Sequence, residues 1–218
     1  MIEHIVPHNP DSRIIARVIA LLRDGGTVAV PTDTSWSLVC SAHSKAGTAA
    51  LKRLSSSRDE RHFSLVCAGI SMAGEYCSLD NTRFRLIKRL SPGPYVFLLD
   101  PLHGTTKKLD LKRGEIGVRI PDHPLALALC EALEGPLYAA TAKRSMVDPS
   151  FGDGDNADDA FAIPEEDLFD DAYELEDIPG IDLILDTGES RPRLLSTVLD
   201  LRPSDPECLR AGCGPWPA

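Results

Sequence analysis

Short apolar runs separated by turn residues predict a series of β-strands along the chain. Each run is four to six residues long and rich in Val, Ile, Leu and Ala, and most are bounded by Gly, Pro, Asp or Ser. The runs cover residues 2–6, 27–30, 36–40, 63–67, 95–99, 116–120, 137–141, 181–185 and 196–201. The run from Tyr95 to Leu99 is apolar at every position, which is typical of a strand buried on both faces.

Apolar positions at helical spacing predict four helices between these strands. They span residues 12–24, 44–54, 81–90 and 125–133, with Asp11 and Ser12 capping the first and Asn81 capping the third. Strands outnumber helices and several connections are short. We therefore expect a mixed α/β (α+β) fold, in which helices cover a twisted mixed sheet without strict strand–helix alternation. A length of 218 residues without an internal repeat favours a single domain over residues 1–218.

Charge is distributed unevenly along the chain. The net charge is −10, and taken as one number it argues against a surface that binds polyanions. However, residues 1–121 carry 17 basic and 11 acidic side chains, whereas residues 122–218 carry 6 and 22. Because residues 1–121 carry a net positive charge, the sequence remains compatible with binding of an anionic ligand.

Most of the acidic excess falls in one segment. Between Asp148 and Glu189 there are 16 acidic residues and no Lys or Arg. We interpret residues 148–178 as a solvated acidic insertion, with a short helix on a loop or partial disorder as the structural alternatives. A calcium-binding loop beginning at Asp153 is excluded, because Pro164 takes the position at which a bidentate Glu is required.

The cysteines and the hydropathy pattern narrow the class of protein. The six cysteines are scattered singly, mostly within apolar runs, and no CxxC occurs, so we expect buried thiols, with neither a disulfide framework nor a resident metal site. No run approaches the roughly 20 apolar residues of a membrane span, and the N-terminal sequence lacks the pattern of a secretory signal. We therefore expect a cytoplasmic protein with no membrane partner.

The first candidate site residues follow a buried strand. The segment VPTDTSW, residues 30–36, presents the hydroxyls of Thr32 and Thr34 where the chain leaves the sheet, which is where open α/β sheets tend to place ligands. A polar turn between two strands is the alternative interpretation. Arg119 lies within an apolar strand and needs an anionic partner, either a protein carboxylate or a bound carboxylate or phosphate.

Further candidates lie near the ends of later strands. Thr141 and Lys143 follow one strand, Ser196 begins another, and Arg210 stands beside Gly212, a residue small enough to let an anion approach closely. Together these residues predict a central cleft with at least two cationic groups and several hydroxyls. Such a cleft suits a nucleotide or an acyl phosphate.

The order of these segments resembles a known family. GGTVAVPTDTSWSL, residues 25–38, looks like the opening signature of the YrdC-type proteins, and SPGPYVFLL, IGVRIPDHPLA, PLYAATAKRS, DLILDTG, LSTVLDL and LRAGCG follow in the order of that family. The resemblance covers residues 25–214, and DNTRFRLIKRLSPGPYVFLL is closer to the YciO-like branch. It implies a YrdC-like fold and the synthesis of threonylcarbamoyl-adenylate (threonylcarbamoyl-AMP) for tRNA modification, from L-threonine, bicarbonate and ATP with release of pyrophosphate.

The resemblance also implies roles for individual residues. By motif, the threonine substrate would be held by Thr32, Thr34, Arg119 and Ser196. The ATP phosphates would meet Arg210 and the residues at two further family motifs, here Arg58, Thr141 and Lys143. Mg²⁺ is expected with ATP, and no residue is assigned a catalytic role.

Three motifs depart from the family pattern. Lys-x-Arg-Pro falls on Ser55 to Arg58, so that serines replace both expected cations, and Ser-x-Asn becomes Thr141-Ala142-Lys143. Trp36 and Ser37 replace the usual Tyr-Gly. Because the implied reaction depends on positioning and on neutralising phosphate charge, other cations would have to compensate. The candidates are Lys143, Lys52, Arg53, Arg58 and Arg61.

A function without chemistry is the main alternative. A YrdC-fold protein could bind RNA or a nucleotide through basic residues of the first half, namely Arg83, Arg85, Lys88, Arg89, Lys107, Lys108, Lys112 and Arg113. The same residues could instead form the solvated faces of helices and loops, and no DNA partner is expected. In a third hypothesis the acidic insertion covers the cleft as a lid and competes with anionic ligands.

Overall fold

The computed structural model describes residues 1–55, 63–109, 114–151 and 163–217. Its strands are β1 (Ile2–His4), β2 (Val28–Val30), β3 (Ser37–Ser41), β4 (Phe63–Val66), β5 (Tyr95–Leu99), β6 (Ile116–Arg119), β7 (Leu137–Thr141), β8 (Leu183–Asp186), β9 (Thr197–Asp200) and β10 (Glu207–Arg210). Its α-helices are α1 (Ser12–Arg23), α2 (Lys45–Leu54), α3 (Ile70–Gly74), α4 (Asn81–Leu90), α5 (Thr105–Lys108) and α6 (Pro124–Leu133). The short 3₁₀ helices are η2 (Arg144–Met146), η3 (Pro149–Phe151), η4 (Glu165–Asp167) and η5 (Ala172–Asp177).

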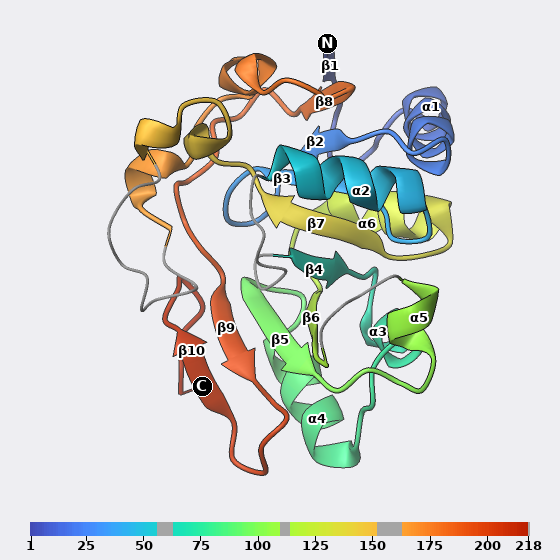
Figure 1. Ribbon diagram of the computed structural model, residues 1–218, viewed down its shortest axis with the longest axis vertical. Coiled ribbons are helices and arrows are strands. Elements are labelled where there is room, and N and C mark those ends of the chain that lie inside the picture. Colours follow the sequence, from blue (N-terminus) through green and yellow to red (C-terminus); the bar gives the residue numbers. More distant parts are fainter. Residues whose placement is uncertain (56–62, 110–113, 152–162, 218) are drawn as a thin grey trace.

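One mixed sheet runs through the whole described part of the chain. It has ten strands in the order β1-β8-β2-β3-β7-β4-β6-β5-β9-β10 (Figure 1). The pairs β1–β8, β2–β8, β4–β6 and β5–β9 are parallel, and the other neighbours are antiparallel. The predicted mixed α/β sheet is thus confirmed, and strands distant in sequence are neighbours in the sheet.

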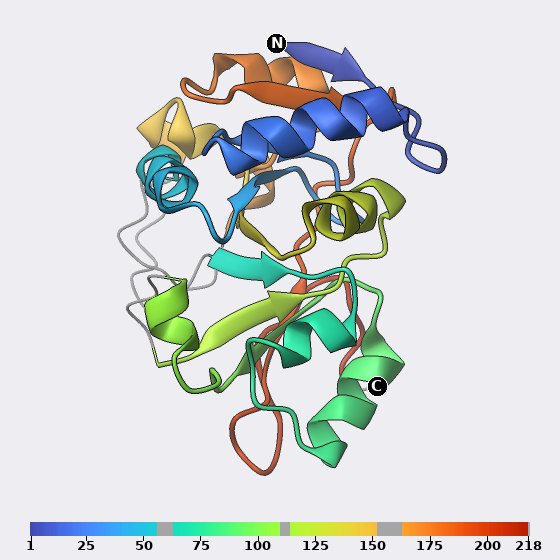
Figure 2. The ribbon, with the colours of Figure 1, turned by 90° about the vertical axis from the view of Figure 1, so that its right-hand side faces the viewer.

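Helices cover the two faces of the sheet unequally. Side chains of α1 and α6 form a core with one face of β2, β3, β7 and β8, and Figure 2 shows these two helices on the same side of the sheet. A larger core on the other face takes residues from α2, α3, α4 and η5, and α2 lies across β3 and β7 in Figure 1. The alternating side chains of β5 show that its second face is not covered by a described helix at this point. Phe97 and Leu99 belong to the larger core, whereas Val96 and Leu98 line a cavity.

Most predicted elements are present, with differences at their ends. The N-cap of α4 is Asp80, whose carboxylate accepts a hydrogen bond from the N–H of Arg83, so the predicted cap at Asn81 is wrong by one residue. The sequence did not predict β10, α3 or α5. Cys208 and Cys213 are exposed, contrary to the expectation of buried thiols, whereas the other four cysteines are buried. No helix in the described ranges is long and apolar enough to cross a membrane.

The later part of the acidic insertion packs against the protein. Leu168, Phe169, Ala172 and Leu175 are buried, and Phe169, Ala172 and Leu175 belong to the larger core. Asp167 is 2% exposed and accepts hydrogen bonds from the backbone N–H (2.6 Å) and hydroxyl (2.8 Å) of Ser145. The prediction of a solvated insertion is therefore wrong for these apolar residues and Asp167, whereas Glu165, Glu166, Glu176 and Asp177 are exposed. The short helices η4 and η5 agree with one of the structural alternatives, and residues 152–162 lie outside the described ranges.

Candidate functional site

Arg119 is held by the loop between β2 and β3. Its side chain, at the end of β6, is almost buried, and Nη2 donates to Asp33 Oδ1 (2.6 Å), Thr34 Oγ1 (2.8 Å) and Thr32 Oγ1 (3.3 Å). The partner of this buried arginine is thus a protein carboxylate, one of the two alternatives that the sequence left open. The loop is more than a polar turn, because its side chains fix the orientation of a guanidinium.

The loop also fixes its own conformation. The Thr32 hydroxyl donates to the carbonyl oxygen of Ser35 (2.7 Å) and accepts a hydrogen bond from the N–H of Thr34 (3.2 Å). Two buried atoms of the ion pair, Asp33 Oδ2 and Arg119 Nε, have no hydrogen-bond partner among the described residues. A buried polar atom without a partner is costly, so this pair retains hydrogen-bonding capacity that other groups can satisfy.

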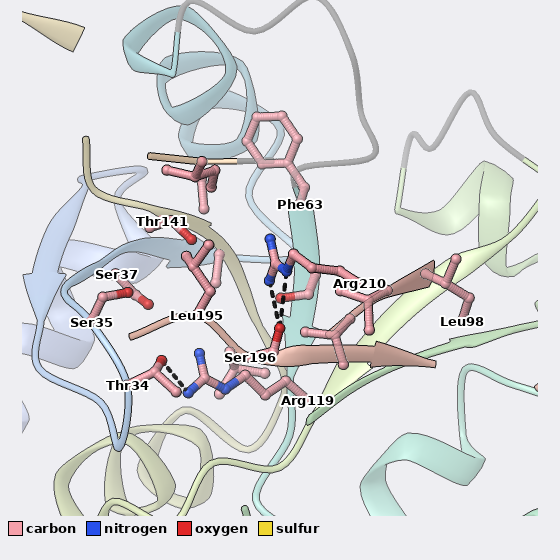
Figure 3. A pocket seen from close by; sticks show the side chains of 17 residues that line it. Thr34, Ser35, Ser37, Phe63, Leu98, Arg119, Thr141, Leu195, Ser196 and Arg210 are labelled. Atoms are coloured by element: carbon pink, nitrogen blue, oxygen red, sulfur yellow. Dashed lines mark hydrogen bonds between the residues drawn. The ribbon is translucent and has the colours of Figure 1, made fainter. Parts of the chain in front are cut away.

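A cavity lies beside Arg119, on a part of the sheet that the described helices leave uncovered (Figure 3). Its polar lining consists of hydroxyls and two arginines, and none of its described lining residues carries a carboxylate. The hydroxyl-bearing residues are Thr34, Ser35, Ser37, Ser64, Thr141 and Ser196, the arginines are Arg119 and Arg210, and the apolar residues include Phe63, Val96, Leu98, Ile163, Leu195 and Val198. This composition favours an anionic ligand with a less polar part.

Arg210, on the edge strand β10, forms another wall of the cavity. Its Nε and Nη2 both donate to the carbonyl oxygen of Ser196, at 3.0 and 2.8 Å, and Figure 3 shows Ser196 between the two arginines in that view. Gly212 lies against the backbone of Leu195 and Ser196, where an added Cβ would come within 2.3 Å of the Leu195 oxygen. Glycine is therefore required at position 212 by the close approach of the chain to itself, and the approach of an anion to this exposed residue stays a prediction.

The structure brings most of the predicted site residues together. Thr34, Arg119, Thr141, Ser196 and Arg210 all line the cavity, and Thr32 contacts Arg119 directly. Lys143 is not among the lining residues and pairs instead with Leu168 in an isolated β-bridge. Arg58 and Arg61 lie outside the described residues, so the proposed cations of that loop stay predictions.

Several residues that line the cavity are not predicted from the sequence. For some of them, however, the alternation of side chains along a strand indicates a polar position. Ser64 interrupts the apolar strand between Phe63 and Leu65, and Ser37 pairs directly with Thr141 across β3 and β7. A polar residue at alternate positions of an otherwise apolar strand faces something other than a hydrophobic core. Ile163 gave no such signal, because its place in the cavity depends on how the acidic segment packs.

Two groups around the ion pair have shifted pKa values. Burial, together with the nearby charge of Arg191, lowers the pKa of His123 to about 4, although Asp33 opposes the shift. Partial desolvation raises the pKa of the Cys213 thiol, which is exposed at the surface, and the charge of Asp33 adds to this effect. His123 is therefore neutral at physiological pH, and the charges of this region are those of Asp33 and the arginines.

Comparison with known proteins identifies the family and the fold of this chain. A family model described as Sua5/YciO/YrdC, "Telomere recombination", matches residues 20–212. The uncharacterized protein YciO of Escherichia coli is 32% identical over 212 residues, which are 97% of this chain and 95% of that protein. Its crystal structure superposes with a TM-score of 0.81 at 30% identity and covers 99% of this chain and 97% of that chain.

Two further relatives have names that state an enzymatic activity or a bound ligand. A mouse protein named threonylcarbamoyl-AMP synthase is 31% identical over 203 residues, which cover 89% of this chain and 65% of that protein. The crystal structure of Sua5 from P. abyssi in complex with L-threonine has a TM-score of 0.77 at 24% identity, covers 97% of this chain and 57% of that chain, and shows the shared fold. By the extent of the family match and the identity to YciO, the chain belongs to the Sua5/YciO/YrdC family.

Proposed function

We propose that this protein is a nucleotidyltransferase of the threonylcarbamoyl-AMP synthase type, which uses L-threonine, bicarbonate and ATP. The observation that supports it best is the convergence of Arg119 and Arg210 on one hydroxyl-lined cavity without a described lining carboxylate. A substrate with a carboxylate and a phosphate needs two separated cations, and an Arg guanidinium suits both groups. The family relationship to a protein named threonylcarbamoyl-AMP synthase supports the same reaction class.

In this reaction the threonine amine first takes up the carbon of bicarbonate, forming a carbamate with loss of water. A carbamate oxygen then attacks the α-phosphorus of ATP, and the bond to the β-phosphate oxygen breaks to release pyrophosphate. The chain contributes mainly by positioning and by stabilising charge. Arg119, with Thr32, Thr34 and Ser196, would hold the amino acid, and Arg210 and Thr141 would face the phosphate.

Mg²⁺ would arrive with ATP. No group of three His, Cys, Asp or Glu side chains in the described ranges is arranged to hold a metal ion. We propose that Mg²⁺ binds mainly to the ATP phosphates, where it neutralises part of their charge.

Pyrophosphate release tests this function. The purified protein with Mg·ATP is expected to release pyrophosphate only when both threonine and bicarbonate are present, and an Arg119→Gln variant is expected to lose this threonine-dependent release. Lys45→Gln, a change in the first turn of α2 and not in the cavity lining, is the matched control and should keep it. Absence of threonine-dependent release from the wild-type protein would reject the enzymatic function.

RNA binding without chemistry is the second candidate. The helix α4 exposes Arg85, Lys88 and Arg89, whereas Arg83 is held by Asp80 and by the carbonyl oxygens of Leu201 and Arg202. An exposed basic stripe on one helix can contact phosphates. If this surface binds RNA, affinity should fall steeply with added salt and should weaken in Arg85→Gln/Arg89→Gln, while affinity for ATP stays unchanged.

A further inference from the structure

Asp170, in the acidic segment 163–178, lies where three parts of the chain meet. Its carbonyl oxygen accepts hydrogen bonds from the indole N–H of Trp36 (3.0 Å) and from the backbone N–H of Arg191 (2.8 Å). Its carboxylate accepts from Arg193, with Nε at 2.9 Å from Oδ1 and Nη2 bonded to Oδ2. One residue therefore connects the start of β3 to the segment that leads into β9.

Glu174 holds Asp170 in place and adds a third connection. The backbone N–H groups of Asp170 and Asp171 donate to Oε2 of Glu174, at 3.0 and 3.1 Å, and Arg144 Nη2 donates to its Oε1 at 2.6 Å. Burial opposes ionisation of Glu174, but these hydrogen bonds outweigh it and lower the pKa of its carboxyl. Arg144 follows β7 in the chain, so the ends of β3, β7 and β9 are all linked through Asp170 and Glu174.

Two of the linked residues, Trp36 and Arg193, lie next to or near residues that line the cavity. Trp36 lies between Ser35 and Ser37, and its fully buried side chain belongs to the larger core while its two neighbours line the cavity. Arg193 precedes Leu195 and Ser196, which form the facing wall. The contacts of Asp170 thus lie behind both walls rather than inside the cavity.

We propose that Asp170 is a positioning residue of the cavity, which sets the spacing between the wall of Ser35 and Ser37 and the wall of Leu195 and Ser196. This inference rests on the proposed function for its substrates. Groups held in place before a ligand arrives bind it without an ordering cost. Without the Asp170–Arg193 pair, residues 190–197 would become ordered only when the ligand binds, and part of the binding free energy would be used for that ordering.

The kinetic signature of this role separates it from a merely structural one. The ordering cost is the same in the bound ground state and in the transition state, so it raises KM and leaves kcat unchanged. Loss of fold stability alone would reduce the amount of active protein, and thus the apparent kcat, with KM unchanged. The pair is partly exposed, with 33% of the Arg193 and 37% of the Asp170 side chain accessible, so the fold should tolerate its removal.

The experiment uses matched variants of the full chain. Asp170→Asn and Arg193→Gln should each raise KM for threonine about 3- to 10-fold with kcat within about 2-fold of wild type. The double variant should be no worse than either single one, and Arg193→Lys should restore part of the affinity. Asp80→Asn is the control, because it weakens an Asp–Arg pair of α4 while Asn still caps that helix.

Amide hydrogen exchange gives a readout that does not depend on activity. In Asp170→Asn, exchange should accelerate in residues 190–197 and also in residues 35–37 across the cavity. Acceleration in 190–197 alone, with KM unchanged, would overturn the proposal. If the wild-type protein shows no threonine-dependent turnover, the proposed function fails, and exchange in residues 35–37 still decides whether Asp170 couples the two walls.

Discussion

The two arginines of the cavity are held in different ways. Arg119, at the end of β6, is 7% exposed and bonded to side chains of the β2–β3 loop, among them the carboxylate of Asp33. Arg210, on the edge strand β10, is half-buried and directs two nitrogens at a backbone carbonyl. Among the described contacts, Arg119 thus belongs to a buried charge pair, whereas two nitrogens of Arg210 share one backbone carbonyl at the edge of the sheet.

This difference indicates how the loss of each arginine should affect stability and ligand binding. Removing one member of a buried ion pair leaves the other charge without compensation in a poorly solvated place, so stability and binding fall together. Arg210 is half-buried on an edge strand, where solvent can replace the contacts of a removed side chain, so stability should fall less. If the proposed function holds, we expect folding and ligand binding to be coupled at Arg119 and more nearly separable at Arg210.

The largest effect is expected for Arg119→Ala. The Asp33 carboxylate, 11% exposed, would lose its cation, and we expect the free energy of unfolding to fall by about 3–5 kcal/mol. Urea unfolding measures this loss, and Asp33→Ala on the same background should recover part of it. A loss below about 1 kcal/mol would show that the pair is solvated and would remove the contrast with Arg210.

Acidification probes the surroundings of Asp33 and Arg119. The folded pKa of His123, about 4, lies below the ordinary value of 6.5, so the unfolded chain binds a proton first as the pH falls. Stability from neutral His123 is complete above pH 6.5 and declines towards pH 4, by up to about 3 kcal/mol. The free energy of unfolding of His123→Asn should decline less steeply between pH 7 and 4 than that of the wild-type protein. Equal slopes would show that His123 does not cause the decline.

Gly212→Ala tests how tightly the Arg210 side of the cavity is built. The added Cβ would meet three backbone atoms of Leu195 and Ser196 within 2.6 Å, so the chain must shift, at a cost of about 1–3 kcal/mol. Gly69→Ala is the matched control, since no atom lies within 4 Å of its added Cβ. Equal unfolding free energies for the two variants would mean that the segment after β10 moves freely away from Ser196.

Arg210→Ala should have the smallest effect on stability. We expect a loss of less than about 1 kcal/mol in urea unfolding, because the residue is half-buried and lies on an edge strand. Affinity for ATP, measured by calorimetry, should nevertheless fall about 10-fold through loss of a charge-assisted contact. A stability loss as large as that of Arg119→Ala would show that both arginines are structural.

Hydrophobic periodicity and turn residues predict most strands of the sheet. Where the prediction differs from the structure, the difference has a physical cause. The strand β10 was missed because its residues, Glu207 to Arg210, are only half-covered at a sheet edge and form no apolar run. Charges outnumber apolar residues in the acidic segment, which is why its sequence predicts a solvated insertion. However, Phe169, Ala172 and Leu175 are spaced so that they reach the core together.

The candidate site was predictable residue by residue but not as a network. The buried position of Arg119 in an apolar strand required a partner, and Asp33 was available in the adjoining polar motif. The contacts of Asp170 with Trp36 and Arg193 join segments far apart in the sequence, so no local pattern could indicate them. The same holds for Lys143, whose proposed role at the phosphates depended on a strand end that turns towards Leu168.

The order of strands in the sheet has a consequence for how the cavity forms during folding. Ser37 pairs with Thr141, Tyr95 pairs with Thr197, and Arg210 joins only through β9. Pairings over such sequence separations form slowly, because each closes a long loop before any contact compensates. A growing chain therefore presents the complete cavity lining only after the strands that carry Thr141, Ser196 and Arg210 have all joined the sheet.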